Sequence, residues 1–419
     1  MTHTSATLIG PLTQVLPMTD LPESGPIADE TLLVREQVGI IVEAAKIRSV
    51  LPWDAARKQA EAYTQLEYFE QREPRVALPG FIDAHTHICF AGSRARDYAL
   101  RNAGKSYLEI AAAGGGIWDT VSQTRKASQE ELVAATVTRA NRLLRQGITT
   151  VEVKSGYGLS VASELRILRA IRAASRQTTA RLIPTCLAAH MCPKDYQGSK
   201  AEYLDLLLRE LLPVLQQEKL SNRVDIFVEQ SAFSVAEAQP YLLAAQAAGF
   251  QLTVHADQFT TGGSALAVKV GALSADHLEV SGEVEIQLLA QSPTVAMALP
   301  GASMGLGCAF APARKLLDAG ATLAIASDWN PGSAPMGNLV LQAAVLGAYE
   351  KLTNAEVLAA ITVRAARALG LTHAGKIAEG HPADLVLYPT DDYREILYQQ
   401  GQLLPIQVFK SGKAVIDVH

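Results

Sequence analysis

The sequence has few cysteines, no strongly basic block and no long apolar run. Cys89, Cys186, Cys192 and Cys308 are scattered among 419 residues, a pattern typical of reduced thiols in a cytoplasm. The formal net charge of −5, without any cluster of Lys and Arg, argues against a nucleic-acid partner. No apolar run is long enough to span a bilayer, and the first residues lack the basic and apolar regions of a signal peptide. We therefore expect a cytoplasmic protein without a membrane anchor.

The composition is that of an ordinary globular protein, with 48% hydrophobic and 19% charged residues. A chain of this length can form two or three domains, or one large barrel with an appendage. The sequence contains no internal repeat, but short β-rich runs alternate with amphipathic helical segments. Eight such runs are present, at residues 81–87, 148–155, 180–190, 224–229, 250–257, 272–278, 294–301 and 322–330.

This alternation predicts a parallel sheet closed into a (β/α)8 TIM-like barrel. The runs are almost continuously apolar, as expected of strands that are buried on both faces. Between them, Ser128 and Glu131 form a capping-box pattern at a helix start, and Gly147 follows the end of that helix. Pro213 should kink another predicted helix.

The two flanks of the chain differ from this central region. Residues 1–78 and residues 372–419 contain strand-like runs, and neither flank could bury a useful core alone. We therefore expect both termini to form one small β-sandwich-like domain beside a barrel at residues 79–371.

Two histidines, His85 and His87, lie at the end of the first predicted strand. Residues i and i+2 of a strand point to the same face, and the carboxyl ends of barrel strands carry the active sites of such enzymes. Two imidazoles there can bind one cation. Two hydrogen-bonded core histidines would fit this pair about equally well.

Other strand ends favour the metal site. His190, His255, His277 and Asp328 end the third, fifth, sixth and eighth predicted strands. Polar side chains inside a barrel must be hydrogen-bonded or bind a ligand, so their gathering on one rim favours a metal centre over the core alternative. The other histidines lie in the flanks: His3, His373, His381 and His419.

Longer motifs carry a family resemblance. "PGFIDAHTH", "VHAD", "SADH", "SDWNPGS" and "GHPADLVLY" resemble the metal-dependent amidohydrolase superfamily in the expected order over nearly the whole chain. "HICFAGSRARDY", "AAAGGGIWDTVSQTR", "KSGYGL" and "HADQFTTGG" most resemble the imidazolonepropionase family within it. The resemblance implies hydrolysis of the cyclic amide C–N bond of 4-imidazolone-5-propanoate to N-formimidoyl-L-glutamate by a metal-bound hydroxide, in histidine degradation. It also implies one divalent zinc or iron ion and a homodimer.

The resemblance assigns roles residue by residue. It implies that the metal ligands are His85, His87, His255 and Asp328. The substrate-binding residues would be Arg94, Tyr157, His190, Gln258, Asn330, Gly332 and Ser333. Arg94 would hold the propionate, a bidentate task that suits a guanidinium group. Without the motifs, Arg94 would more simply be a solvated loop residue, Tyr157 and His190 packing residues, and Pro331–Gly332 a turn.

The expected chemistry needs a strong nucleophile at neutral pH, and a divalent metal lowers the pKa of bound water from about 15.7 to near 7. Asp328 would accept the water proton and return it to the departing ring nitrogen. His277 would stabilise the oxyanion. We expect Glu229 to orient a metal ligand from behind, and Lys154 to support the site rather than bridge two metals as a carboxylated lysine.

Two departures from the family pattern affect the pocket. Gln258 stands where some members carry Glu, and an amide cannot act as a general base. Residues 303–307 read "SMGLG", where aromatic residues are common. Two alternatives stay open: another amidohydrolase, such as a deaminase or a dihydropyrimidinase-like enzyme, and a non-catalytic metal-binding barrel. The N/O donor set does not choose between zinc and iron.

Overall fold

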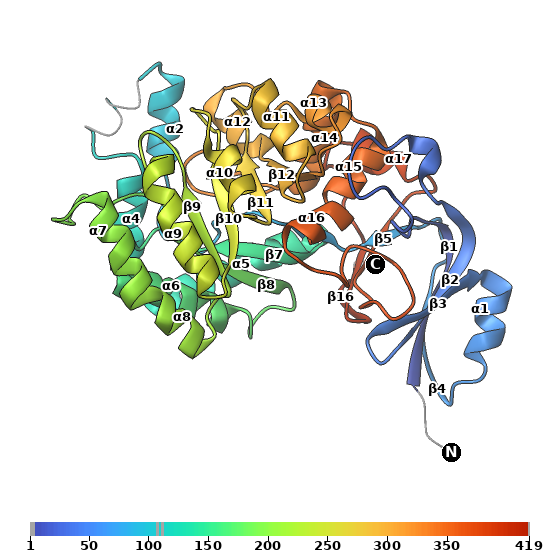
Figure 1. Cartoon of the computed structure of the whole chain (residues 1–419). Coiled ribbons are helices and arrows are strands. Elements are labelled where there is room, and N and C mark those ends of the chain that lie inside the picture. Colours follow the sequence, from blue (N-terminus) through green and yellow to red (C-terminus); the bar gives the residue numbers. More distant parts are fainter. Residues whose placement is uncertain (1–4, 106–108, 110–112, 418–419) are drawn as a thin grey trace.

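The computed structural model describes residues 5–105, 109 and 113–417 and contains two eight-stranded sheets. One sheet is surrounded by helices, and the other lies beside it, where the N-terminal (blue) and C-terminal (red) segments meet (Figure 1). Among the described residues, no helix is long and apolar enough to cross a membrane.

The central sheet is a parallel barrel, as predicted. Its strands pair in sequence order, and every pair with a determined register is parallel. The strands are β6 (Phe81–Asp83), β7 (Ile148–Lys154), β8 (Arg181–Ala189), β9 (Arg223–Phe227), β10 (Gln251–Ala256), β11 (Ser274–His277), β12 (Val295–Ala298) and β13 (Leu323–Ile325).

Segments beyond the first and last strands bring the two edges of the barrel together. The Asp328 N–H donates to the His85 carbonyl at 3.0 Å, and the His87 N–H donates to the Trp329 carbonyl at 2.9 Å. Thr86 and Trp329 form an isolated parallel bridge. The strands β6 and β13 are therefore shorter than predicted, because the backbone leaves the regular ladder where the site residues begin; Asp328 has φ 50°.

Helices connect the barrel strands, and the last three of them follow β13. They are α2 (Ala95–Asn102), α4 (Ile117–Lys126), α5 (Gln129–Arg145), α6 (Val161–Ala174), α7 (Lys200–Leu206), α8 (Leu212–Glu218), α9 (Val235–Ala247), α10 (Gly263–Lys269), α11 (Glu283–Ala290), α12 (Pro300–Leu306), α13 (Ala313–Asp318), α14 (Leu339–Glu350), α15 (Asn354–Ala360) and α16 (Val363–Ala368). The capping box of Ser128 and Glu131 is present. At Pro213 the expected irregularity is a π-helical turn, Leu207–Leu211, because proline cannot donate the normal helical hydrogen bond.

The second sheet combines the two termini, as predicted. Its strands are β1 (Ser5–Val15), β2 (Arg35–Glu43), β3 (Lys46–Pro52), β4 (Gln65–Glu70), β5 (Val76–Pro79), β14 (Leu385–Tyr388), β15 (Gln407–Lys410) and β16 (Lys413–Asp417). β5 joins the N-terminal strands to β14. Two further helices, α1 (Trp53–Ala60) and α17 (Arg394–Tyr398), belong to these flanking segments. We infer that the small domain and the barrel meet close to residues 78 and 372.

The two sheets share part of their packing. One core of the terminal sheet includes Ile9, Ile40 and Phe409. Leu78 and Val386, from β5 and β14, belong instead to the main barrel core. The terminal sheet is therefore packed against the barrel.

Candidate metal centre and active site

Four side-chain atoms converge where the edges of the barrel meet. The Nε2 atoms of His85 and His87 lie 3.2 Å apart, and His255 Nε2 lies 3.4 Å from His87 Nε2. Asp328 Oδ1 lies 3.5 Å from His85 Nε2 and 3.3 Å from His87 Nε2. A tetrahedral centre with bonds of about 2.0–2.1 Å separates its ligand atoms by roughly 3.3–3.4 Å. The atoms of His85, His87 and Asp328 therefore fit a single small cation, and His255 Nε2 lies beside this group, next to His87 Nε2.

The chemistry of these donors also fits a cation. All four side chains are nearly inaccessible to solvent. Burial lowers the pKa of His85 well below its ordinary value and that of His87 to about 3, and it lowers the pKa of His255. Neutral imidazoles offer a lone pair to a metal. Asp328 Oδ1 is buried without a hydrogen-bond partner among the described residues, which a bound cation would correct.

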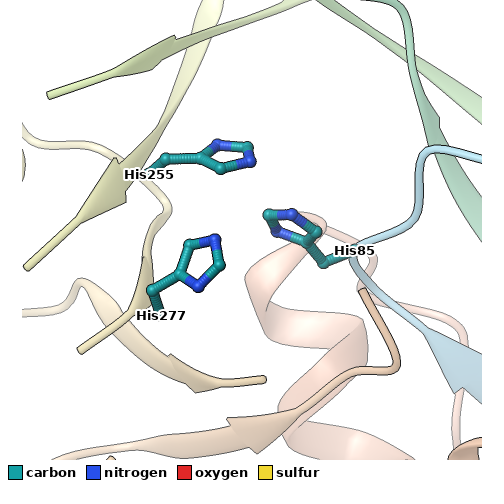
Figure 2. A group of neighbouring side chains, drawn as sticks. All are labelled: His85, His255 and His277. Atoms are coloured by element: carbon teal, nitrogen blue, oxygen red, sulfur yellow. The ribbon is translucent and has the colours of Figure 1, made fainter. Parts of the chain in front are cut away.

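His277 forms a second group with His85 and His255. The three rings come from separate segments and point toward one another (Figure 2). His277 Nδ1 lies 3.4 Å from Glu279 Oε1, which also accepts from the Ser303 hydroxyl at 3.3 Å. Burial lowers the pKa of His277, but the contacts with Glu279 outweigh it and the net shift is upward. His277 thus lies at the edge of the centre with its Nδ1 directed toward Glu279.

Two carboxylates lie behind the rings. His85 Nδ1 is hydrogen-bonded to Asp276 Oδ2 at 2.7 Å, and His255 Nδ1 forms an ion-pair contact with Asp225 Oδ2 at 2.9 Å. An ionised carboxylate only accepts hydrogen bonds, so His85 Nδ1 carries the proton and its Nε2 faces the centre with a lone pair. Asp225 and Asp276 were not predicted as site residues, although they lie in the predicted strand runs at residues 224–229 and 272–278.

Lys154, at the end of β7, lies directly behind these carboxylates. Its Nζ is 2.8 Å from Asp225 Oδ2, 2.9 Å from Glu152 Oε1 and 3.7 Å from Asp276 Oδ2. Burial lowers its pKa, but Asp225 and Glu152 outweigh burial and raise it. An ammonium among three carboxylates is not the neutral amine that carboxylation requires, so the position fits support of one metal and not a bridge between two.

Aromatic side chains border the centre on its open side. The ring of His190 stacks on that of His87 with centroids 5.6 Å apart, and Tyr157 lies 5.6 Å from His190. The Gly156 carbonyl lies 3.1 Å from His190 Nδ1. Because a carbonyl only accepts, His190 Nδ1 is the donor and its Nε2 is left for another partner.

Arg94 lies at the start of α2. Its Nε donates to Asp97 Oδ2, which also accepts from the Gly116 N–H at 2.9 Å. A Cβ added at Gly332 would lie 3.4 Å from Arg94 Nη1. The predicted anion-binding residue is therefore anchored through Nε, and loop residue Gly332 allows its close approach.

Asn330 shapes the loop after β13. Its Oδ1 accepts from the Gly332 and Ser333 N–H groups, both at 2.8 Å, and its Nδ2 donates to the Ser333 hydroxyl at 2.9 Å. The amide group of Asn330 is therefore hydrogen-bonded within the loop itself. Asn330 and Ser333 support the wall of the pocket in this way, and Gly332 leaves room beside Arg94.

The loop after β10 holds Gln258, which is 9% exposed. Glu229 binds this loop: its Oε2 accepts from the Phe259 and Thr260 N–H groups, both at 3.0 Å. The expectation that Glu229 orients a metal ligand was wrong. The strand end alone did not reveal that its carboxylate turns to neighbouring backbone donors instead of a histidine ring.

Comparison with known proteins agrees with this geometry. Residues 76–415 match the model of the amidohydrolase family. The chain is 42% identical over 376 residues to the imidazolonepropionase of Symbiobacterium thermophilum, covering 89% of this chain and 88% of that protein. It is 40% identical over 396 residues to the imidazolonepropionase of Bdellovibrio bacteriovorus, covering 93% and 91%.

Solved structures share the fold at lower identity. An adenosine deaminase from Xanthomonas campestris with bound zinc superposes with a TM-score of 0.71 at 22% identity, covering 98% of this chain and 93% of that one. A triazine hydrolase variant superposes with a TM-score of 0.75 at 17% identity, covering 98% and 95%. From its matched length and its relatives, the chain belongs to the amidohydrolase family of hydrolases and, within it, to the imidazolonepropionases.

Proposed function

We propose that this hydrolase opens the cyclic amide of 4-imidazolone-5-propanoate to give N-formimidoyl-L-glutamate, as a step of histidine degradation. The observation that carries the proposal is the cluster of His85, His87, His255 and Asp328 donor atoms, each 3.2–3.5 Å from at least one other, in a chain 42% identical to an imidazolonepropionase.

The same four residues would hold one divalent metal. When bound, zinc or iron would supply Lewis acidity that lowers the pKa of a water molecule from about 15.7 to near 7. His85 is prepared as a ligand because Asp276 accepts its Nδ1 proton, and Asp225 lies in ion-pair contact with His255 Nδ1. The zinc-bound deaminase with the same fold makes zinc the first metal to test.

Asp328 is proposed to move the proton. Burial raises the pKa of its carboxyl group, so it can accept a proton from the attacking water and pass it to the ring nitrogen that leaves. His277 would donate to the carbonyl oxygen as negative charge develops there, with Glu279 holding its opposite nitrogen. The two groups thus have complementary tasks on the water and the carbonyl.

The remaining pocket residues would orient the substrate. Arg94 would bind the propionate through its Nη atoms, because its Nε is already anchored on Asp97. Tyr157 and His190 would border the imidazolone ring, and Gln258 would contribute a hydrogen bond without accepting a proton. Asn330, Gly332 and Ser333 would keep the loop open for the carboxylate end.

We further infer that the enzyme works in the cytoplasm as a homodimer, because all four cysteines are free and the family resemblance implies the dimer. The direct test incubates the purified protein with imidazolonepropionate and follows substrate loss, N-formimidoyl-L-glutamate formation and metal content. One metal per chain with product formation is expected. Two metals per chain, or full activity after complete metal removal, would contradict the proposal.

A further inference from the structure

We propose that Lys154 is a positioning residue whose single ammonium group fixes three metal-ligand segments at once. The inference rests on the proposed metal centre and adds a task for a side chain that does not reach the centre itself. Lys154 lies at the end of β7 and is 1% exposed. Its ammonium group forms ion pairs with buried carboxylates inside the barrel.

The first connection links Lys154 to His255 through Asp225. Lys154 Nζ and His255 Nδ1 lie 2.8 and 2.9 Å from the same oxygen, Asp225 Oδ2. Because one atom receives both contacts, a shift of the ammonium moves the carboxylate and with it the imidazole. The Nε2 of His255 faces the metal position, so its direction depends on Lys154 through one intermediate group.

The second connection links Lys154 to His85 through Asp276. Asp276 Oδ2 lies 2.7 Å from His85 Nδ1 and 3.7 Å from Lys154 Nζ. The Thr253 hydroxyl donates to this oxygen at 3.1 Å. The longer lysine distance gives mainly an electrostatic contact, which balances the charge of the carboxylate that sets the His85 tautomer.

The third connection links Lys154 through Glu152 to the backbone of Thr86, between His85 and His87. Lys154 Nζ donates to Glu152 Oε1 at 2.9 Å, and Glu152 Oε2 accepts from the Thr86 N–H at 3.2 Å. The Thr86 hydroxyl also donates to the Glu152 carbonyl at 2.6 Å. The segment that carries two of the four proposed ligands is therefore tied to the same ammonium.

Charge makes Lys154 hard to replace. The side chains of Glu152, Asp225 and Asp276 are at most 1% exposed, and Lys154 is the only cationic side chain with an ion pair to any of them among the described residues, apart from the ligand histidines. Like charges that lose their common cation in a buried site repel one another. Removing Lys154 should loosen both carboxylate–histidine pairs.

The test compares metal release from wild type and Lys154→Met. Each protein is loaded with Co²⁺, its absorption spectrum is recorded, and the rate of metal loss to excess chelator is measured. Loss of a supporting group typically costs 10- to 100-fold in metal affinity, so we expect Lys154→Met to release cobalt about 10- to 100-fold faster, with an altered spectrum.

Arg364→Met is the matched control. Arg364, on α16, is also a buried cation, but its Nη2 donates to the carbonyls of Pro22 and Gly25 at 3.2 and 2.7 Å, and its charge interacts with Glu356 and Arg367 rather than with the three carboxylates. Its loss should lower the melting temperature while the rate of cobalt release stays within about twofold of wild type. A change in stability alone therefore does not imitate the expected effect.

An unchanged release rate and spectrum in Lys154→Met would overturn the positioning role, whatever happens to the melting temperature. If Lys154→Met does not fold, Lys154→Arg carries the test, because it keeps the charge but cannot place one compact nitrogen among three oxygens. Faster release from Lys154→Arg is expected, and wild-type kinetics would refute the proposal. A wild-type protein that binds no cobalt would instead refute the proposed metal centre.

Discussion

Replacing Arg94 with alanine tests how the pocket recognises the carboxylate of its substrate. The guanidinium is anchored by Asp97 through Nε, and Nη1 lies beside Gly332. A charge-assisted contact of this kind should contribute about 2–4 kcal/mol to kcat/KM. The expected loss is therefore roughly 30- to 1,000-fold, and it should appear mainly as a higher KM because the reacting amide is held elsewhere.

Part of that loss could come from Asp97 rather than from the substrate. The side chain of Asp97 is 4% exposed, and without Arg94 it would keep the Gly116 N–H but lose its cationic partner. Asp97→Asn measures this contribution separately. It keeps an oxygen acceptor and leaves Arg94 in place, so we expect a loss of about tenfold or less in kcat/KM. Arg94→Lys should fall between wild type and Arg94→Ala, because a lysine keeps the charge without the bidentate geometry.

The assay is steady-state hydrolysis of imidazolonepropionate at several substrate concentrations, with metal content checked for each variant. The reasoning predicts that the KM of Arg94→Ala rises far more than its kcat falls. Kinetics within threefold of wild type would show that Arg94 is an ordinary loop residue and would reopen the identity of the substrate. An equal loss in Asp97→Asn and Arg94→Ala would assign the effect to the loop rather than to carboxylate binding.

Three further predictions address proton transfer and pH. Asp328→Asn removes a ligand charge and the proposed proton acceptor, so kcat should fall about 10³-fold or more in metal-replete enzyme. Gln258→Glu keeps the hydrogen-bonding reach of the side chain, so activity should stay within about tenfold of wild type and the acidic limb of the pH profile of kcat/KM should not move. A hundredfold gain with a new acidic limb would mean that the natural enzyme lacks its base and acts on another substrate. Burial raises the pKa of Asp83 from 3.8 to about 7, so the folded state holds this proton more tightly than the unfolded chain. The unfolding free energy of the metal-free protein should therefore fall by up to about 4 kcal/mol as pH rises from about 4 to about 7. Urea unfolding at several pH values measures this change, and Asp83→Asn should make the unfolding free energy less dependent on pH.

The barrel and the rim of the site could be predicted from the sequence because both depend on local order along the chain. Eight apolar runs separated by helical segments leave few arrangements other than a closed parallel sheet. The carboxyl ends of its strands must then share one rim, so His85, His190, His255 and His277 were placed together without any knowledge of distances. The pairing of the two termini followed because neither flank could bury a core alone.

The tertiary structure decided how the rim is used. His85, His87 and Asp328 come within 3.2–3.5 Å of one another because segments beyond β6 and β13 are hydrogen-bonded to each other, and His255 approaches His87 from β10. His277 is turned toward Glu279 instead. The sequence also gave no sign that Glu229 binds a loop or that Asp225 and Asp276 hold the histidine rings. Strand periodicity determines the face on which a side chain lies. The partner of that side chain depends on the neighbouring strands and on burial, because a buried charge without a partner is energetically unfavourable. For Lys154, strand geometry already places Glu152 of β7 on the same face, but only the barrel brings Asp225 of β9 and Asp276 of β11 to the same ammonium.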